Sequence, residues 1–208
     1  MKKKIYYWSP FLSQIATPKA VINSAYSLKK YSKNYECFII NFFGEFNVFK
    51  KVIDEKKINC FNSPYDKIRK FLPFKGKIKS RLSFVVIFIL SFFPLKKILD
   101  KEKPDYLVVQ LITSLPMFLI LLFDFKTKFI LRISGLPRIT FFRKILWKLA
   151  LKKFEYITCP TISTMEYLSN LNIVDRKKIK ILFDPIIEVS QSRIKCNSKN
   201  ITEHKNYY

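Results

Sequence analysis

A chain of 208 residues, of which 49% are hydrophobic, is long and apolar enough to bury the core of one α/β domain. Its 39 basic and 15 acidic side chains give a net charge of +24. That charge suits an anionic lipid or nucleic-acid surface, unless it is compositional drift toward lysine. The single histidine, His204, lies in a polar tail, which excludes a histidine-based nucleophile relay within this chain. The four cysteines lack metal-binding spacing, so we expect buried free thiols and no metal site.

The first third of the chain alternates apolar strands with helices. Thr17 and Pro18 mark a helix start, because threonine is a favoured cap and proline suits the first helical position. The predicted elements are strands at 4–8, 35–43 and 57–61, with helices beginning at 17 and spanning 47–56.

A strongly basic stretch at 66–81 leads directly into an uncharged apolar run at 82–95. One interpretation is a membrane-surface element, in which cations meet lipid headgroups beside an apolar helix. The other is a buried helix preceded by a solvated basic loop. The run is shorter than a bilayer span. The cations expected at a membrane surface are Lys67, Arg69, Lys70, Lys75, Lys77, Lys79 and Arg81.

A second apolar run, at 106–123, is long enough to be a membrane helix, and an integral membrane protein is therefore one alternative. Polar residues interrupt its middle, however. Gln110 is expected to end a strand, and Thr113 or Ser114 to cap a helix that begins near Pro116. Strand, turn and helix is the interpretation we favour.

In the second half, apolar strands repeatedly end in a small polar turn and then a helix. The predicted strands are 129–134, 156–159 and 179–183, and the helices are 139–154 and 163–171. This alternation predicts an α/β fold with a Rossmann-like, doubly wound parallel sheet. Such sheets bind ligands at the carboxyl ends of their strands. The candidate substrate-binding residues at those ends are Ser134, Gly135, Arg138, Thr161 and Asp184.

Each candidate has a structural alternative. Ser134, Gly135 and Arg138 offer a hydroxyl, open backbone N–H groups and a cation to a sugar or phosphate, or they form a plain turn. Because glycine is scarce here, Gly135 is expected to supply a special backbone shape or a close approach. Thr161 binds a ligand or caps a helix. Asp184 binds an acceptor hydroxyl or shapes an Asp-Pro turn.

The order of these elements, with the segments 5–10, 16–20, 129–135, 159–161 and 182–187, resembles the N-terminal half of family-4 glycosyltransferases. Those enzymes have the GT-B fold, in which two Rossmann-like domains face each other across a cleft. The likeness spans about residues 3–189. It implies an N-terminal domain at 1–189, and at 190–208 a linker and the start of a missing second domain, as in a truncated product.

The resemblance implies sugar transfer from a nucleotide-sugar to a lipid-linked or cell-surface polysaccharide acceptor, in lipopolysaccharide or polysaccharide biosynthesis. It places the protein at the cytoplasmic, inner face of the cell membrane. The donor would be a substrate bound mainly by the missing second domain, and no cofactor is expected. The family's paired glutamates lie in that domain, so we expect this chain alone to be inactive, with no catalytic residue named. Two departures are a first turn, at 9–13, that lacks glycines and the absence of a histidine at 132–135.

The alternative is a basic protein that binds a membrane surface or nucleic acid without catalysis. Nucleic-acid binding predicts aromatic side chains interleaved with basic ones on a groove or sheet face. In this sequence the aromatic residues lie mainly inside apolar strands and helices, which argues against nucleic acid.

Overall fold

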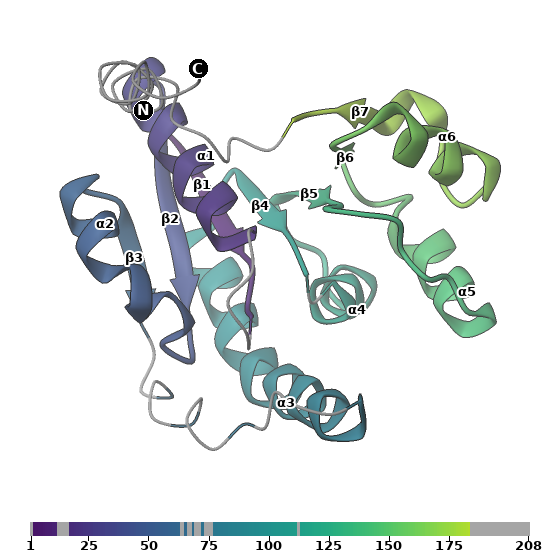
Figure 1. Ribbon diagram of the computed structural model, residues 1–208, viewed down its shortest axis with the longest axis horizontal. Coiled ribbons are helices and arrows are strands. Elements are labelled where there is room, and N and C mark those ends of the chain that lie inside the picture. The colour runs from purple at the N-terminus through teal and green to yellow at the C-terminus, as the bar shows by residue number, and fades with distance from the viewer. Residues whose placement is uncertain are drawn as a thin grey trace, which may run out of the picture.

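The structure is a computed structural model that describes residues 2–11, 17–62, 65, 68, 72, 77–111 and 113–183, without the side chains of 77–80. Its centre is a seven-stranded parallel sheet in the order β3-β2-β1-β4-β5-β6-β7 (Figure 1). The strands are β1 (Lys3–Trp8), β2 (Tyr35–Asn41), β3 (Asn59–Asn62), β4 (Tyr106–Val109), β5 (Lys128–Arg132), β6 (Tyr156–Cys159) and β7 (Ile179–Ile181). The predicted Rossmann-like α/β fold is confirmed.

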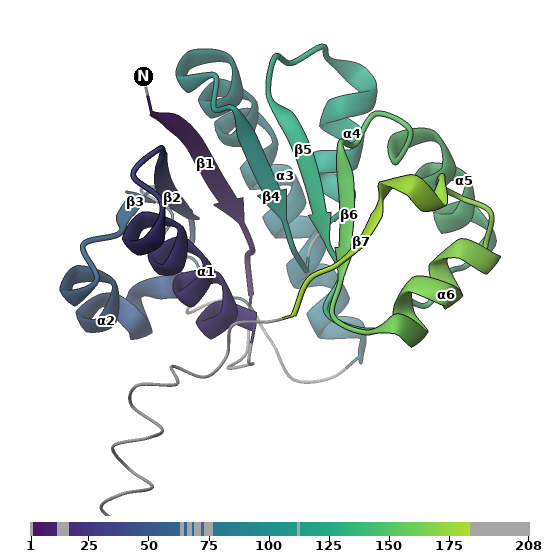
Figure 2. The same cartoon turned by 90° about the horizontal axis from the view of Figure 1, so that it is seen from above.

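Helices connect the strands and cover both faces of the sheet (Figures 1 and 2). One face carries α1 and α2, and the other carries α3, α4 and α5, while α6 packs beside β6 and β7. The α-helices are α1 (Thr17–Tyr31), α2 (Lys50–Glu55), α3 (Lys77–Glu102), α4 (Ser114–Leu122), α5 (Phe141–Ala150) and α6 (Ile162–Asn170). Short 3-10 helices are η1 (Glu45–Phe49) and η3 (Arg176–Lys178).

Two apolar cores lie on the opposite faces of the sheet, because successive strand side chains alternate in direction. In β1, Ile5 and Tyr7 enter the core beneath α1, whereas Tyr6 and Trp8 enter the larger core beneath α3, α4 and α5. Helix α6 adds Leu168 to the larger core. Both faces of the sheet are therefore used for packing, as in other parallel sheets.

The apolar run at 106–123 divides into β4 and α4, as predicted. The strand β2 is shorter than predicted and ends at Asn41, where the chain turns through Gly44 in a left-handed conformation with φ of 70°. The side-chain oxygen of Asn41 accepts a hydrogen bond from the backbone N–H of Phe46 at 3.0 Å, which fixes the turn into η1. Hydrophobic periodicity does not reveal this local capping, so the end of β2 was predicted two residues too late.

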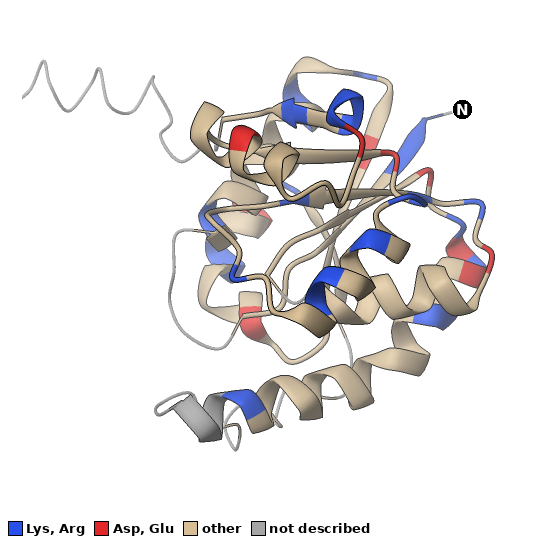
Figure 3. Ribbon diagram, turned by 90° about the vertical axis from the view of Figure 1, so that its right-hand side faces the viewer, with Lys and Arg blue, Asp and Glu red and all other residues tan. Residues whose placement is uncertain are grey.

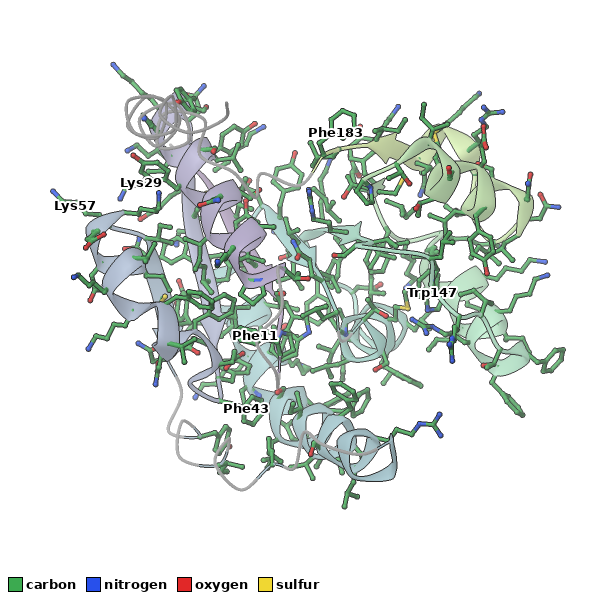
Figure 4. The ribbon with its side chains drawn as sticks, viewed as in Figure 1. Phe11, Lys29, Phe43, Lys57, Trp147 and Phe183 are labelled. Carbon is green, nitrogen blue, oxygen red and sulfur yellow. The ribbon has the colours of Figure 1, made fainter. Side chains whose placement is uncertain are left out.

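Helix α5 does not bury every apolar side chain that has the spacing of a core face. Phe142, Ile145 and Leu149 are 82%, 45% and 52% exposed, whereas Leu146 packs against the core. Trp147 and Ala150 are the buried residues of this helix, and Figure 4 shows Trp147 on the side that faces the body of the protein. The helix therefore packs through a narrow stripe and presents apolar side chains outward.

Candidate functional site

The carboxyl ends of all seven strands meet at one edge of the sheet, the lower edge in Figure 2. The strand order reverses between β1 and β4, because β1 is followed outward by β2 and β3, and β4 by β5, β6 and β7. A crevice outside the strand ends at such a reversal is where open α/β sheets bind ligands.

Ser9 and Gln110 face each other at this reversal. In the pairing of β1 with β4, Trp8 lies opposite Val109, so the next positions in register are Ser9 and Gln110. The backbone N–H of Gln110 donates to the carbonyl oxygen of Trp8 at 2.8 Å, which extends the ladder by one bond. By strand alternation both side chains point toward the face that carries α1.

Both side chains are buried and yet lack partners. Ser9 is 0% exposed and Gln110 is 1% exposed. Within the described part of the chain, neither the Ser9 hydroxyl oxygen nor the Gln110 Oε1 and Nε2 atoms make a hydrogen bond. A buried, unpaired polar group costs about 1–3 kcal/mol, and native proteins rarely leave one without a reason. Three such atoms at a strand-order reversal form our candidate site, the switch-point pair.

Backbone strain lies next to this pair. Leu111, directly after Gln110, has a φ of 60°, a left-handed conformation that bulky side chains rarely adopt. Such outliers cost about 1–3 kcal/mol and gather at functional sites. The strained backbone of Leu111 is therefore a second unusual feature next to the unpaired side chains.

Sequence reasoning missed the pair as a site. Gln110 was recognised only as the polar end of a strand, and Ser9 only as part of a turn without glycines. Their adjacency depends on β1 and β4 being neighbours in the sheet, although a hundred residues separate them in the chain. The available signal was a polar residue directly after each of two apolar strands.

Three predicted residues lie in the loop after β5, the strand next to β4. Ser134, Gly135 and Arg138 are all exposed at the strand-end edge. The loop is tied to α6 by the hydroxyl of Tyr167, which donates to the carbonyl oxygen of Pro137 at 3.2 Å. The structure therefore brings these residues together with one another, one strand away from the switch-point pair.

The expectation that Gly135 supplies a special backbone shape is wrong. Its φ is not in the left-handed region, and a Cβ atom built at Gly135 would meet nothing within 4 Å. The glycine with a left-handed φ is Gly44, at the end of β2. Nothing in the described chain thus requires glycine at 135, and the space above it is open.

Thr161 lies at the end of β6 on the same edge and caps α6. Its hydroxyl oxygen accepts from the backbone N–H of Thr164 at 3.2 Å and lies 2.9 Å from the Thr164 hydroxyl oxygen. The capping alternative is therefore observed. Asp184 lies outside the described residues, as do Lys67, Arg69, Lys70 and Lys75. Lys77 and Lys79 are described only by their backbone in α3, and Arg81 is exposed.

A shallow groove of about 400 Å³ runs beside α1 on the face of β4, β5, β6 and β7 that no described helix covers. Its lining is mostly apolar and includes Tyr106, Val108 and Ile130. Buried Arg132 donates from Nη2 to the carbonyl oxygens of Phe183 at 3.0 Å and Leu182 at 3.4 Å, where the chain leaves β7. Figure 4 shows Phe183 at this exit. Such a lining suits an apolar segment better than a sugar.

Burial also controls the titration of Tyr7, one of the residues that line this groove. The hydroxyl of Tyr7 hydrogen-bonds with Ser24 of α1, and burial raises the pKa of Tyr7 far above its usual range. The nearby charge of Arg132 opposes the rise in the pKa of Tyr7 only weakly. The phenol therefore stays protonated at neutral pH and acts as a hydrogen-bonding group, not as a base.

A polar pocket of about 580 Å³ lies between α2 and the ends of β2 and β3. Its lining includes Asn41, whose Nδ2 donates to the Oδ1 atoms of Asn47 at 3.0 Å and Asn62 at 2.8 Å. Because the Asn41 oxygen is also used by Phe46, the amide has a complete structural role. No three His, Cys, Asp or Glu side chains gather closely enough for a metal ion within the ranges that the structure describes.

Comparison with known proteins establishes the fold. No protein-family model matches the chain, and a search of curated proteins finds no match. A glycosyltransferase from Rickettsia africae superposes with a TM-score of 0.59 at 15% identity, covering 98% of this chain and 51% of that protein. The UDP-GlcNAc 2-epimerase of Neisseria meningitidis, bound to UDP-GlcNAc, has a TM-score of 0.57 at 14% identity, covering 95% of this chain and 52% of that protein. The UDP-GlcNAc 2-epimerase of Rickettsia bellii has a TM-score of 0.56 at 11% identity, covering 98% of this chain and 50% of that protein.

The chain thus spans about half the length of each of these enzymes. Identities this low establish the fold alone, which is that of one half of a GT-B-like protein. This is the fold that the resemblance in sequence had implied.

Proposed function

We propose that the chain is the acceptor-binding half of a glycosyltransferase that uses a nucleotide-sugar donor. The observation that carries the proposal is the switch-point pair, Ser9 and Gln110, in a sheet shared with sugar-nucleotide enzymes. The proposal includes family-4 membership and a lipid-linked or polysaccharide acceptor at the inner face of the cell membrane. A second domain would bind most of the donor.

The chemistry of the pair fits a sugar. The Gln110 amide offers both a donor and an acceptor, and the Ser9 hydroxyl offers either, which matches sugar hydroxyl groups. Neither side chain is charged, so the pair itself favours neutral hydroxyls over phosphates. Arg138, exposed one strand away, is the nearest predicted cation for a phosphate of a lipid-linked sugar.

The chain alone should not transfer sugar, because the reacting groups are aligned only when both domains hold their substrates. The test incubates the purified chain with several nucleotide-sugars and a membrane extract. No turnover is expected, and robust transfer by the chain alone would overturn the half-enzyme assignment. Conversion of UDP-GlcNAc to its 2-epimer without an acceptor would instead favour an epimerase half, as two of the neighbours suggest.

Binding can be measured without turnover. Isothermal titration calorimetry suits this site, because the neighbouring Trp8 side chain lies in the core on the other face of the sheet and is no direct fluorescent reporter. A short-chain polyprenyl diphosphate sugar is expected to bind, and Gln110→Ala should weaken its binding at least tenfold. Ser163→Ala, exposed on α6, is the control. Equal binding by the Gln110 variant would remove the pair from the site.

Arg138 is tested in the same assay. Loss of a charge-assisted hydrogen bond costs about 1.5–3 kcal/mol, so Arg138→Ala should weaken a diphosphate ligand roughly ten- to hundredfold. The Arg138 variant should bind a sugar without phosphate as tightly as the unchanged chain does. The matched variant Arg176→Ala, which changes an exposed arginine of η3, should bind both ligands normally. Unchanged diphosphate binding would assign Arg138 to the solvated surface.

A further inference from the structure

Helix α3 has an unusual distribution of side chains. Its buried residues recur at every fourth position, so that one stripe faces the inside of the protein. That stripe reads Ser83, Ile87, Ser91, Leu95 and Leu99, each no more than 2% exposed. Two of its five residues are therefore serines, and the Ser91 hydroxyl has no hydrogen-bond partner in the described part of the chain.

The opposite side of α3 is apolar and exposed. Leu82, Phe84, Val85, Ile89 and Phe93 are 61%, 42%, 52%, 62% and 74% exposed. A helix that lies against water normally places its polar side chains outward and its apolar ones inward. The first half of α3 reverses that order, which indicates an apolar environment on its outer side.

The exposed apolar surface continues onto the two helices beside α3. The rings of Phe88 on α3 and Phe118 on α4 make an edge contact with centroids 5.7 Å apart, and α4 packs in turn against α5. The exposed apolar residues of these neighbours are Phe118 and Leu122 of α4 and Phe141, Phe142, Ile145 and Leu149 of α5. We call the exposed residues of the three helices the apolar face. Single exposed apolar residues are ordinary, whereas a set that spans three helices marks an interaction site.

Cations border the apolar face. On α5, Lys144 and Lys148 are exposed and follow Phe141 and Ile145 around the same outer arc of the helix. Arg81 is exposed at the first described side chain of α3. Residues 82–95 of α3 carry no charge, and in Figure 3 blue segments lie on the helices above this part of α3. Apolar side chains flanked by cations fit an interface between acyl chains and anionic headgroups.

We propose that the apolar face docks onto the surface of an anionic lipid bilayer, with α3 lying in the plane of the interface. A second copy of the chain is the rival occupant, but two chains that each carry a net charge of +24 repel each other. The same charge is attracted to anionic lipid. The proposal does not depend on glycosyl transfer, because it concerns a different face from the strand-end site.

A spanning helix fits the structure less well. By length and composition, α3 is the one helix in the described chain that could cross a membrane, and only 28% of its most apolar window is buried. However, Ile87, Leu95 and Leu99 of the stripe belong to the larger core together with residues of the sheet. Removing α3 from the sheet would expose the core residues Ile87, Leu95 and Leu99 together with the strands beneath them.

If the proposal is right, salt alone should not release the protein from the membrane. Exposed apolar side chains insert independently of ionic strength, whereas the lysines are screened. We expect flotation with vesicles of phosphatidylcholine and phosphatidylglycerol, weakened but not abolished by molar salt, and little flotation with phosphatidylcholine alone. Failure of the intact chain to float with the anionic vesicles overturns the proposal.

Variants locate the surface. Ile89→Glu with Phe93→Glu should lower vesicle partitioning roughly a hundredfold, since each exposed apolar side chain that inserts contributes at least a tenfold factor. The control Val48→Glu changes an apolar residue on η1, at the opposite face, that is 54% exposed, and this variant should bind normally. All three proteins should melt at the same temperature, because none of these side chains is buried. Equal binding by the α3 variant, or equal loss in the control, overturns the assignment.

Two measurements separate the rival arrangements. Phe93→Trp should be quenched most strongly by spin labels near the headgroups if α3 lies in the interface, and by labels at the bilayer centre if α3 spans. Light scattering should show a monomer at low concentration. A dimer that Ile89→Glu dissociates would assign the apolar face to a second copy, and quenching at the bilayer centre would assign α3 to a spanning role; either result overturns the proposal.

Discussion

Helices α1 and α3 cover opposite faces of the same sheet and distribute their side chains in opposite ways. α1 buries Ala20, Val21, Ile22 and Ala25 and ends in exposed Lys29 and Lys30, the pattern of a helix between a core and water. The first half of α3 turns serines inward and large apolar residues outward. The exposure of each residue therefore indicates what surrounds a helix. The overall hydrophobicity of the helix does not.

The largest expected effect comes from replacing a buried isoleucine by alanine on each of the two helices. Ile22→Ala in α1 and Ile87→Ala in the inner stripe of α3 should each lower the free energy of unfolding by about 2–5 kcal/mol, because each leaves a cavity. Ile89→Ala on the outer side of α3 should change it by less than about 0.5 kcal/mol. Urea denaturation in the absence of lipid measures all three. A large loss at Ile89 would show that the outer side of α3 is buried in solution, and the contrast with α1 would fail.

The sequence predicted the alternation of strands and helices because that alternation depends on local periodicity. The division of the run at 106–123 depended on Gln110, Ser114 and Pro116, which punctuate it locally. By contrast, the order of the strands, and with it the pairing of Ser9 with Gln110, arises from contacts between distant segments. Periodicity alone does not encode such contacts.

The apolar face was only partly predictable for a related reason. The apolar run at 82–95 and its basic neighbour suggested a membrane-surface element, but equally a buried helix. On α5, Phe142, Ile145 and Leu149 have the spacing of a core face, and only the packing of Trp147 shows that they lie outward. Helical spacing identifies a stripe but not the direction in which the stripe points.

A smaller effect with opposite signs comes from serines on the two helices. Ser91→Ala in α3 removes a buried hydroxyl without a described partner and should raise the free energy of unfolding by about 1 kcal/mol. Ser24→Ala in α1 removes the hydrogen-bond partner of the buried Tyr7 hydroxyl and should lower it by about 1–3 kcal/mol. Thermal and urea unfolding of the Ser91→Ala and Ser24→Ala variants check the prediction. Destabilisation by both variants would mean that Ser91 has a partner in solution and that the inner stripe of α3 is not unusual.

The smallest expected effect is a pH dependence that originates in the core beneath α1. Cys37 and Cys60 pack there, and burial raises the pKa of each thiol from 9.0 to about 11. Between about pH 9 and 11 the unfolded thiols have lost their protons while the folded thiols keep theirs. The unfolded state therefore binds fewer protons, so stability must fall as the pH rises through that window.

The double variant Cys37→Ala and Cys60→Ala should flatten this alkaline decline in the urea midpoint. Burial also raises the pKa of Cys159, but Cys159 belongs to the core on the opposite face, so Cys159→Ala reports that side separately. We expect the Cys159 variant to flatten the decline less, because the pKa of its thiol rises less than those beneath α1. If the double variant declined with pH as steeply as the intact chain, lysine and tyrosine titration would account for the alkaline loss. The core beneath α1 would then have no part in it.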